Sequence, residues 1–276
     1  MQASAPQALV HELQALLGVF DTVGVALSGG VDSLTLAAAA HAACGRGSTM
    51  YHARSGAVPP EATARVQAMA AARGWRLEVF DAGEFARADY VANPVDRCFH
   101  CKTSLYASMR ARTTAQLVCG TNLDDLGEYR PGLRAATEHG VRHPFVEVGA
   151  NKATVRAMAL TLGLGEVAEL PAAPCLASRI ETGIPIEAPT LARVHACERM
   201  VGAALGARTV RCRVRAGGVV LELDQAALQA AGEARRAELA AAVRRLFAEA
   251  GPPPEVSFAA YRNGSAFLVP ASGARA

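Results

Sequence analysis

Six consecutive residues near the N-terminus have the types and the order that suit phosphate binding: Ser28, Gly29, Gly30, Val31, Asp32 and Ser33. The apolar stretch 23–27 before them is too short for a helix, and it predicts a buried parallel strand. Glycines without a Cβ atom let backbone N–H groups turn toward a ligand. Asp32 and Ser33 then open an Ala/Leu-rich helix over 34–43, whose N-terminus carries about half a positive charge. Strand, turn and helix together predict an anion site for phosphate.

The spacing excludes two other phosphate-binding loops. A Walker A loop requires Gly-Lys-Ser/Thr, which does not follow here, and a Rossmann fingerprint requires a third glycine further on. The remaining alternative is an ordinary strand-to-helix turn that is rich in glycine.

A second group of polar residues follows the predicted strand 116–119 and begins at Gly120. The adjacent carboxylates Asp124 and Asp125 suit Mg²⁺, a hard cation that prefers oxygen ligands and ATP phosphates. Asp is also favoured at a helix N-cap and first turn, so a capping role is the alternative. Arg130 and Arg134 come next and are available to pair with phosphate or carboxylate.

Three of the seven cysteines lie in predicted loops. Cys98 and Cys101 form a C-x-x-C pair, and Cys175 lies in a loop that prolines on its approach make stiff. A zinc ribbon would need a second pair, which the sequence lacks. A thioredoxin-type redox pair normally opens a helix straight after a strand, which Asn93-Pro94 argues against. The other four are interpreted as small buried hydrophobic residues, and they are Cys44, Cys119, Cys197 and Cys212.

The thiolates of Cys98, Cys101 and Cys175 would hold three irons of a 4Fe–4S cluster and leave the fourth iron without a protein ligand. Such an open iron would carry an exogenous sulfide beside a substrate. The alternative is an incidental pair with an unrelated cysteine.

The elements that must position these residues alternate along the chain. Strands are predicted at 23–27, 49–53, 77–80 and 116–119, and helices at 9–17, 34–43, 60–74, 102–112 and 151–162. This alternation predicts an α/β fold with a doubly wound parallel sheet. Ligands bind beyond the carboxyl ends of such strands, where Ser28, Asp81 and Gly120 would lie.

A Gly/Pro cluster at Gly183-Ile184-Pro185 predicts a domain boundary, with the nucleotide-binding domain at 1–183 and a smaller α+β domain at 184–276. The second domain is expected to contain helices at 189–205 and 234–248 and strands at 209–214 and 219–223. A last strand is expected after 252–254, and a loop from Tyr261 onward.

Composition limits the class of protein. A length of 276 residues allows about two domains, and 51% hydrophobic with 19% charged residues indicates a globular chain. The net charge of +3 is too small to argue for nucleic-acid binding. We find no secretory signal and no apolar run of membrane-spanning length, so we expect reduced thiols, a cytoplasmic location and no membrane partner. Arginine dominates the basic residues, and the only lysines, Lys102 and Lys152, each lie beside a motif.

The Ser28–Ser33 stretch resembles the signature of the PP-loop ATP pyrophosphatases, which have an adenine nucleotide α hydrolase-like fold and cleave ATP between the α- and β-phosphates to adenylate a substrate. With the other motifs, the chain more specifically resembles the LarE family of ATP-dependent sulfur transferases, which help build the nickel-pincer nucleotide cofactor. The further matching segments are Asn93-Pro94, Arg97 to Lys102, Gly120 to Asp125, Tyr129 to Gly132, and Pro174 to Ile180.

This resemblance implies a substrate, cofactors and roles for residues. The family's substrate is pyridinium-3,5-biscarboxylic acid mononucleotide, a small anionic nucleotide whose carboxylates become thiocarboxylates. Some members donate sulfur from one cysteine at the Cys175 position, whereas others carry three cysteines and a cluster; this chain has all three, which favours the cluster. ATP, Mg²⁺, a sulfide or other sulfur donor and a homo-oligomeric state are expected. The further site residues implied are Ser178, Arg179, Glu198, Arg211 and Arg213, beside the Ser28–Ser33 loop with Asp32 as a catalytic residue.

Two other functions stay open. Some PP-loop enzymes that thiolate tRNA also combine a C-x-x-C pair with a distant cysteine, but such an enzyme should have a basic RNA-binding face. A non-catalytic module that binds ATP or an iron–sulfur cluster is the second alternative. The match also weakens in the second domain, where Ala216 stands at a position at which the family's basic strand is expected to have His.

Overall fold

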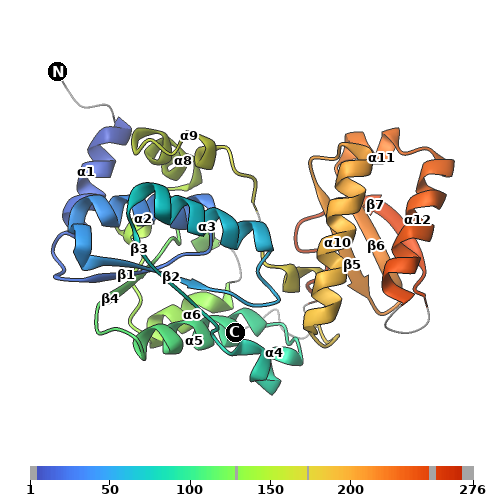
Figure 1. Ribbon diagram of the computed structural model, residues 1–276, viewed down its shortest axis with the longest axis horizontal. Coiled ribbons are helices and arrows are strands. Elements are labelled where there is room, and N and C mark those ends of the chain that lie inside the picture. The colour runs from blue at the N-terminus through green and yellow to red at the C-terminus, as the bar shows by residue number, and fades with distance from the viewer. Residues whose placement is uncertain (1–4, 128–129, 173, 249–252, 269–276) are drawn as a thin grey trace. The chain divides into compact units, whose positions relative to one another are not determined.

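A computed structural model describes residues 5–127, 130–172, 174–248 and 253–268 (Figure 1). The chain forms two compact units. The first comprises residues 1–84 and 96–173, and the second comprises residues 85–95 and 174–276.

The first unit is built on a parallel sheet of β1 (Val23–Ala26), β2 (Ser48–Ala53), β3 (Arg76–Phe80) and β4 (Gln116–Cys119), in the order β3-β2-β1-β4. Strand β1 lies between two neighbours, and Val25 pairs with Met50 on one side and with Val118 on the other. All four residues of β1 are buried, as a strand covered on both faces requires. The predicted α/β class and parallel sheet are confirmed.

The strand order predicts a ligand crevice between the loops that follow β1 and β4. From β1 the chain moves outward through β2 to β3, and it then returns to place β4 on the other side of β1. The loops after β1 and β4 therefore diverge, and such a switch point is where open α/β sheets bind ligands. These two loops begin at Leu27 and Gly120.

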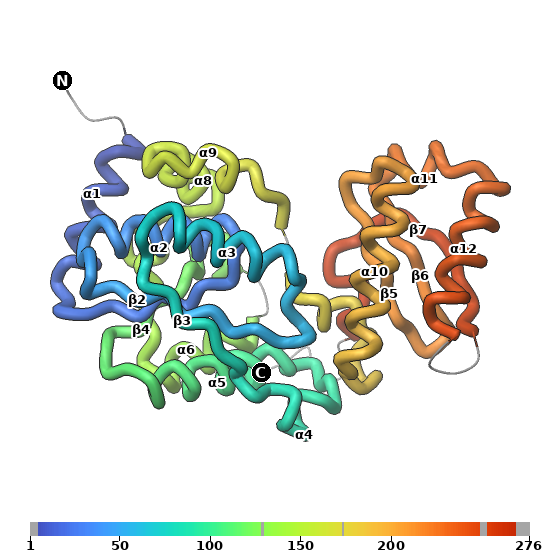
Figure 2. Tube along the Cα trace, in the orientation of Figure 1, coloured from blue at the N-terminus to red at the C-terminus, as the bar shows by residue number. Residues whose placement is uncertain are grey.

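Helices cover both faces of the sheet (Figures 1 and 2). One face packs against α1 (Ala5–Leu17), α2 (Val31–Cys44), α3 (Pro60–Arg73) and α8 (Lys152–Thr161). The opposite face packs against α5 (Arg97–Arg110) and α6 (Pro131–Glu138). Because strand side chains alternate, Val118 joins the α2 face, whereas Leu117 and Cys119 join the α5 face.

The remaining elements of the first unit are short. They are η1 (Gly45–Gly47), η3 (Leu123–Gly127), α7 (Pro144–Glu147) and α9 (Gly165–Ala168), and η2 (Glu84–Ala86) lies where the first unit passes into the second. Among the described residues, no helix is both long enough and apolar enough to cross a membrane.

Helix α5 begins five residues before the predicted start at 102, so Cys98 and Cys101 lie in its first turns. The prediction of a loop around this pair is therefore wrong. Asn93 has a left-handed φ of 53° and, with Pro94, ends the preceding helix, and a helix forms again from Arg97.

The second unit contains a three-stranded sheet of β5 (Val210–Arg215), β6 (Gly218–Leu223) and β7 (Val256–Ala260), in the order β5-β6-β7. The β5–β6 pair is antiparallel, and β7 runs parallel to β6. The helical elements are α4 (Ala88–Val91), η4 (Leu176–Arg179), α10 (Ala188–Leu205), α11 (Gln225–Ala230) and α12 (Glu233–Ala248). The structure thus contains the expected small α+β unit, including a strand after 252–254.

The second unit begins at Pro174, ten residues before the start expected from sequence at 184, and it also takes in 85–95. Asn93 explains both differences. Its buried side-chain amide donates to the carbonyl oxygens of Glu181, at 2.8 Å, and Ile184, at 2.9 Å. Ile180 in turn forms a bridge with Val214 of β5, so the segment before the Gly/Pro cluster is bound to the second sheet.

His52 on β2 provides a pH test of the first unit. Its Nδ1 donates to the Leu27 carbonyl oxygen at 2.8 Å, and its Nε2 lies at hydrogen-bond distance, 2.9 Å, from the Thr63 hydroxyl. Burial lowers the pKa of His52 below its ordinary 6.5. The unfolded chain therefore binds the extra proton first, and the free energy of unfolding should fall as the pH drops below about 6.5.

Denaturant unfolding between pH 7.5 and 5 measures this slope. His52→Gln should flatten it, whereas His11→Gln, on the exposed face of α1, should run parallel to the wild type. Equal slopes for the wild type and His52→Gln would contradict the assignment.

Candidate active site

The loop after β1 is closed by its own serines. The Ser33 hydroxyl donates to the Gly30 carbonyl oxygen at 3.1 Å, and it accepts from the Ser28 backbone N–H at 3.1 Å. The Ser28 and Ser33 hydroxyl oxygens lie 3.1 Å apart. The turn therefore folds over the first residues of α2, in the strand–turn–helix arrangement that the sequence predicted.

Gly29 can be no other residue in this conformation. Its φ is +85°, and a Cβ atom there would lie 2.9 Å from the Ala62 carbonyl oxygen on α3. Arg65, also on α3, donates to the Gly29 carbonyl oxygen at 2.9 Å. Helix α3 thus fixes the conformation of the loop through its contacts with Gly29. Arg65 is a residue of the site that the sequence analysis did not single out.

The loop after β4 meets the start of α2 at very short range. A Cβ atom on Gly120 would lie 2.9 Å from the Asp32 carbonyl carbon and 3.0 Å from the Ser33 nitrogen. Asn122, two residues further on, is buried and donates from its amide to Asp32 Oδ1 at 3.2 Å. The two loops of the switch point are thereby joined through Asp32.

Lys152 adds a third segment to this site. Its Nζ lies 2.5 Å from Asp32 Oδ2, and its backbone N–H donates to Asp124 Oδ2 at 3.1 Å. Lys152 is the first residue of α8, whose N-cap is the Asn151 side chain. Helices α2 and α8 therefore both begin at this site, and the partial positive charge at each N-terminus favours a bound anion.

Asp124 and Asp125 act in the local fold of their loop. Asp125 Oδ2 accepts from the Asn122 backbone N–H at 3.0 Å, and Asp125 Oδ1 pairs with Arg130 at 2.8 Å. Together with the bond from Lys152 to Asp124, these contacts show the capping role that the sequence left as an alternative. They place Arg130 beside a carboxylate of this loop.

The donor set fits Mg²⁺ bound together with phosphate. Asp32, Asp124 and Asp125 offer carboxylate oxygens, the ligand that Mg²⁺ prefers. Within the described ranges, no three His, Cys, Asp or Glu side chains gather closely enough to hold a metal by themselves. A magnesium ion here would therefore take further ligands from phosphate and water, as Mg²⁺ usually does.

The C-x-x-C pair lies on α5 beside α6, and Cys98 and Cys101 are both half-buried. Gly132 allows the two helices to approach, since a Cβ atom there would lie 3.1 Å from the Lys102 side chain. The Arg134 guanidinium stacks over the Phe99 ring, 3.7 Å from the ring centroid. Phe99 lies between the two cysteines in sequence. The structure thus places Arg134 on Phe99, a neighbour of Cys98 in sequence; Tyr129 of the same motif lies outside the described residues.

In the second unit, Arg179 holds the loop that carries Cys175. The Arg179 guanidinium donates to the carbonyl oxygens of Pro174, at 2.7 Å, and Cys175, at 3.1 Å. Glu198 on α10 binds the same guanidinium with both carboxylate oxygens, at 2.9 and 3.0 Å. Glu198 and Arg179 are therefore partners, and together they fix the backbone beside the exposed Cys175 thiol.

Two further arginines of β5 surround this pair. Arg213 is buried against Glu222 at 2.9 Å and donates to the Ser178 carbonyl oxygen at 3.0 Å. Burial, and then the charge of Arg179, lower the pKa of Arg211, which stacks over the Tyr261 ring at 5.6 Å. The unit therefore concentrates positive charge next to Ser178 and Arg179.

The structure also shows where sequence reasoning stops. Asp81 accepts from the Gly83 N–H at 2.8 Å and follows β3, two strands away from β1, so it caps a turn. Cys98 and Cys101 belong to the first unit and Cys175 to the second, so the three-cysteine cluster stays a prediction. Asn122 and Lys152 bind Asp32 directly; their signals were the motif around Asn122 and the rarity of lysine in the chain.

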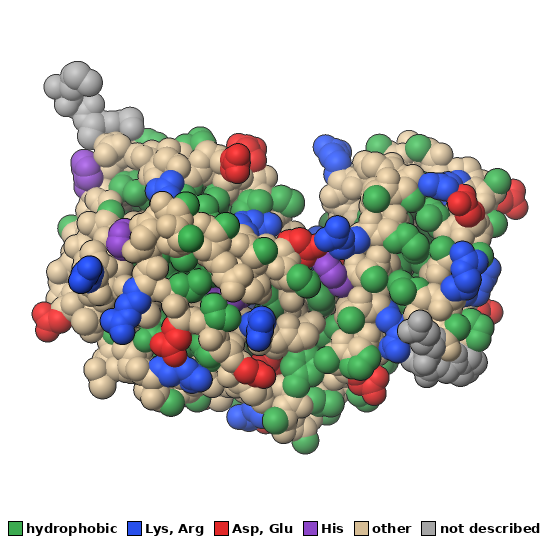
Figure 3. Space-filling model, viewed as in Figure 1, with side chains coloured by type: hydrophobic (Ala, Val, Ile, Leu, Met, Phe, Trp, Pro, Cys, Tyr) green, Lys and Arg blue, Asp and Glu red, His purple; other side chains and the backbone are tan. Residues whose placement is uncertain are grey.

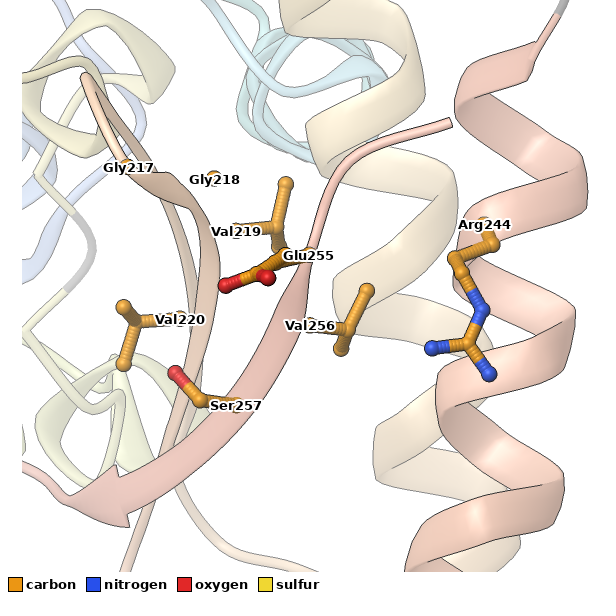
Figure 4. A pocket seen from close by; sticks show the side chains of 8 residues that line it. All are labelled: Gly217, Gly218, Val219, Val220, Arg244, Glu255, Val256 and Ser257. Carbon is orange, nitrogen blue, oxygen red and sulfur yellow. The ribbon is translucent and has the colours of Figure 1, made fainter. Parts of the chain in front are cut away.

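A separate hollow of about 290 Å³ lies in the second unit, at the β6–β7 end (Figure 4). Figure 4 shows Glu255 and Arg244 on either side of Val256 at its wall. Position 218 requires glycine, because its φ is +127° and a Cβ atom there would lie 2.5 Å from the Glu255 carbonyl oxygen. The residues that line this hollow include none of the expected site residues.

Comparison with known proteins gives three relatives. A protein of Synechocystis sp., described only as uncharacterized, is 34% identical over 224 residues, which cover 80% of this chain and 83% of the relative. The pyridinium-3,5-bisthiocarboxylic acid mononucleotide synthase of Lactiplantibacillus plantarum is 29% identical over 78% of this chain and 79% of its own. An uncharacterized protein of Methanocaldococcus jannaschii is 29% identical over 40% of this chain and 44% of its own. No protein-family model matches the chain.

A parallel four-stranded sheet with a Ser-Gly-Gly-Val-Asp-Ser turn after its central strand defines the class of the PP-loop proteins. Within this class, the relatives extend over both units of the chain and show its family. The chain belongs to the LarE family, which its motifs resemble.

Gly120 offers a test of the site's geometry. The sequence predicts that ATP binds at this junction. Gly120→Ala should then push the β4 loop away from Asp32 and weaken ATP binding about tenfold, or about 1.4 kcal/mol. Titration calorimetry measures the affinity. Gly127→Ala is the matched control, because a Cβ atom on Gly127 meets nothing within 4 Å. Equal affinities for the two variants would show that the close approach does not position the nucleotide.

Proposed function

We propose that this protein is an ATP-dependent sulfur transferase. It adenylates a substrate carboxylate with release of pyrophosphate, and sulfur then replaces AMP to give a thiocarboxylate. By analogy with the synthase of Lactiplantibacillus plantarum, whose name contains the bisthiocarboxylic product, the substrate is pyridinium-3,5-biscarboxylic acid mononucleotide. The observation that carries the proposal is the junction at Asp32, where two loops and two helix N-termini form an anion site.

The order of steps follows from leaving-group chemistry. A carboxylate does not lose oxide to a sulfur nucleophile at neutral pH, because oxide is too basic. Adenylation makes that oxygen part of AMP, which leaves readily. ATP supplies the activating group, and the residues that would hold its phosphates are Ser28, Gly29, Gly30 and Ser33 of the loop after β1.

Charges at the site support phosphate chemistry. Lys152 would offset the negative charge that develops on the phosphates, and its pairing with Asp32 keeps the ammonium in place. Mg²⁺ would neutralise the phosphates further and would take its protein ligands from Asp124 and Asp125. The guanidinium of Arg130, which is bound to Asp125, adds a positive charge to this loop.

The second unit supports binding of an anionic substrate. Arg179, Arg211 and Arg213 bring three guanidinium groups near Ser178, whereas Glu198 and Glu222 balance part of their charge. Guanidinium groups bind phosphate and carboxylate with two parallel hydrogen bonds. Arg179 and Arg213 are buried and bound to Glu198 and Glu222, so we assign an anionic group of the substrate to Arg211, which is partly exposed beside them.

For the sulfur, we propose a 4Fe–4S cluster held by Cys98, Cys101 and Cys175. The half-buried pair on α5 and the exposed thiol of Cys175 fit this chemistry, since thiolate sulfur is the usual ligand of such clusters. The cluster would supply an iron able to carry sulfide. Arg179 and Glu198 would position Cys175 through its backbone.

The alternative function, tRNA thiolation, would need a basic RNA-binding face. On the face shown in Figure 3, Lys and Arg side chains are interspersed with Asp and Glu and form no continuous band. A net charge of +3 is also small for binding a long polyanion.

Asp32 provides the direct test of adenylation. Asp32→Asn removes the carboxylate charge that binds Lys152, and pyrophosphate release with the substrate should fall at least a hundredfold. Ser28→Ala should also abolish it by opening the loop. Asp81→Asn is the control, because Asp81 follows β3 at the same sheet edge and caps a turn. Wild-type pyrophosphate release by folded Asp32→Asn would refute the proposed role.

The cluster is tested by iron and sulfide analysis after anaerobic purification. Cys98→Ala, Cys101→Ala and Cys175→Ala should each lose iron and sulfur transfer while keeping ATP binding. Cys197→Ala, at a buried position, is the control that should keep iron.

The rival mechanism uses Cys175 alone as a sacrificial donor. It predicts that Cys98→Ala and Cys101→Ala stay active and that Cys175 loses about 34 Da, the mass of H₂S, in one turnover. Iron-free protein that completes a turnover with this mass loss would rule out the cluster.

A further inference from the structure

Cys119 lies in a polar cluster within the first unit, at the end of β4 that carries the nucleotide loop. Its side chain is 6% exposed, as expected for a small buried residue. Its contacts, however, are not those of a hydrophobic side chain. The Sγ atom lies 3.1 Å from His143 Nδ1 and 3.3 Å from the Thr121 hydroxyl, and the Tyr106 hydroxyl is hydrogen-bonded to the same sulfur.

Each partner comes from a different element, so the cluster is built by the fold. Tyr106 projects from α5, Thr121 follows β4, and His143 directly precedes α7. Arg142, next to His143, forms a parallel bridge with Val118, which brings the imidazole alongside the end of β4. Three polar groups therefore converge on one sulfur atom.

The charges around this sulfur favour a thiolate. Burial would raise the pKa of the Cys119 thiol, but the hydrogen bond with His143, the charge of His143 and the charge of Lys102 lower it to about 7. The hydrogen bond with Cys119 raises the pKa of His143, which burial opposes and the charge of Glu147 assists. Thiolate and imidazolium thus stabilise each other, as in enzymes that use cysteine as a nucleophile.

We propose that Cys119 accepts a sulfane sulfur atom from a small persulfide or polysulfide and holds it as a persulfide beside the nucleotide loops. The low exposure of Cys119 restricts the donor to a small molecule. Its biological role rests on the proposed sulfur transfer, whereas the reaction at Cys119 needs no ATP.

The reaction balances without an oxidant. The Cys119 thiolate attacks the terminal sulfur of a donor R–S–SH, a new S–S bond forms to Cys119, and the S–S bond of the donor breaks. The donor leaves as R–S⁻ and takes the proton of the His143 imidazolium, which becomes neutral. The products are the Cys119 hydropersulfide and R–SH.

Cys44 is an internal control in the same unit. It is half-buried, more exposed than Cys119, and burial raises the pKa of its thiol above 9.0. At pH 7 roughly one per cent or less of Cys44 is a thiolate, against about half of Cys119. Reactivity governed by exposure favours Cys44, and reactivity governed by ionisation favours Cys119.

The test uses the reduced full-length protein, with every cysteine followed by peptide mass spectrometry. Iodoacetamide at pH 7 should label Cys119 at least ten times faster than Cys44, with a pH midpoint near 7. Sodium tetrasulfide followed by alkylation should add about 32 Da, one sulfur atom, to the Cys119 peptide. His143→Asn should move the midpoint of Cys119 labelling upward by at least one pH unit.

Labelling of Cys44 as fast as Cys119, or no sulfur gained at Cys119, would overturn the proposal. If His143→Asn does not fold, the wild-type pH profile decides. A wild type that releases no pyrophosphate would remove the proposed adenylation while leaving this measurement intact, so the two failures are distinguishable.

Discussion

The first unit depends on the bridge from Asp32 to Asn122 and Lys152. These two contacts join the starts of α2 and α8 to the loop after β4, three segments far apart in sequence. A half-buried carboxylate that binds a cation and an amide gives each of the three segments one position. Gly120 allows this arrangement because it leaves no side chain between the β4 loop and Asp32. The turn after β1 is therefore positioned by contacts with the loop after β4 and with the start of α8.

Local patterns predicted the first unit well, since each element there carries its own signal. The short Val/Leu stretch of β1, the double glycine after it and the Ala-rich α2 agree on one strand–turn–helix unit. Long-range contacts left no such signal. Nothing in the neighbours of Asn93 indicates that its amide binds Glu181 and Ile184, and this contact assigns 85–95 to the second unit. The start of α5 lies five residues before the predicted one, because residues 97–101 carry no apolar periodicity that would indicate a helix.

The same distinction applies to the two groups of site residues. The conformation of the Ser28–Ser33 turn was predictable, because a strand, a double glycine and a helix start follow one another at fixed spacing. The roles of Arg179 and Glu198 were not, since each was expected to act on a ligand and the structure pairs them with each other. A buried ion pair of this kind adds little net stability, but removing either partner leaves an uncompensated charge. Their arrangement therefore fixes the geometry of the Cys175 loop more than it stabilises the unit.

The two lysines of this arginine-rich chain lie at positions that suit an ammonium group. Lys152 reaches Asp32 at a junction that three segments crowd, and Lys102 lies where Gly132 brings α6 against α5. An ammonium group is a compact point charge on a flexible stem, whereas a guanidinium is a planar fork that needs room on two sides. Both positions accommodate an ammonium group more readily than a guanidinium group. Lys102 also contributes to the charge that lowers the pKa of Cys119, so each lysine places a positive charge beside an anion at the edge of the same sheet.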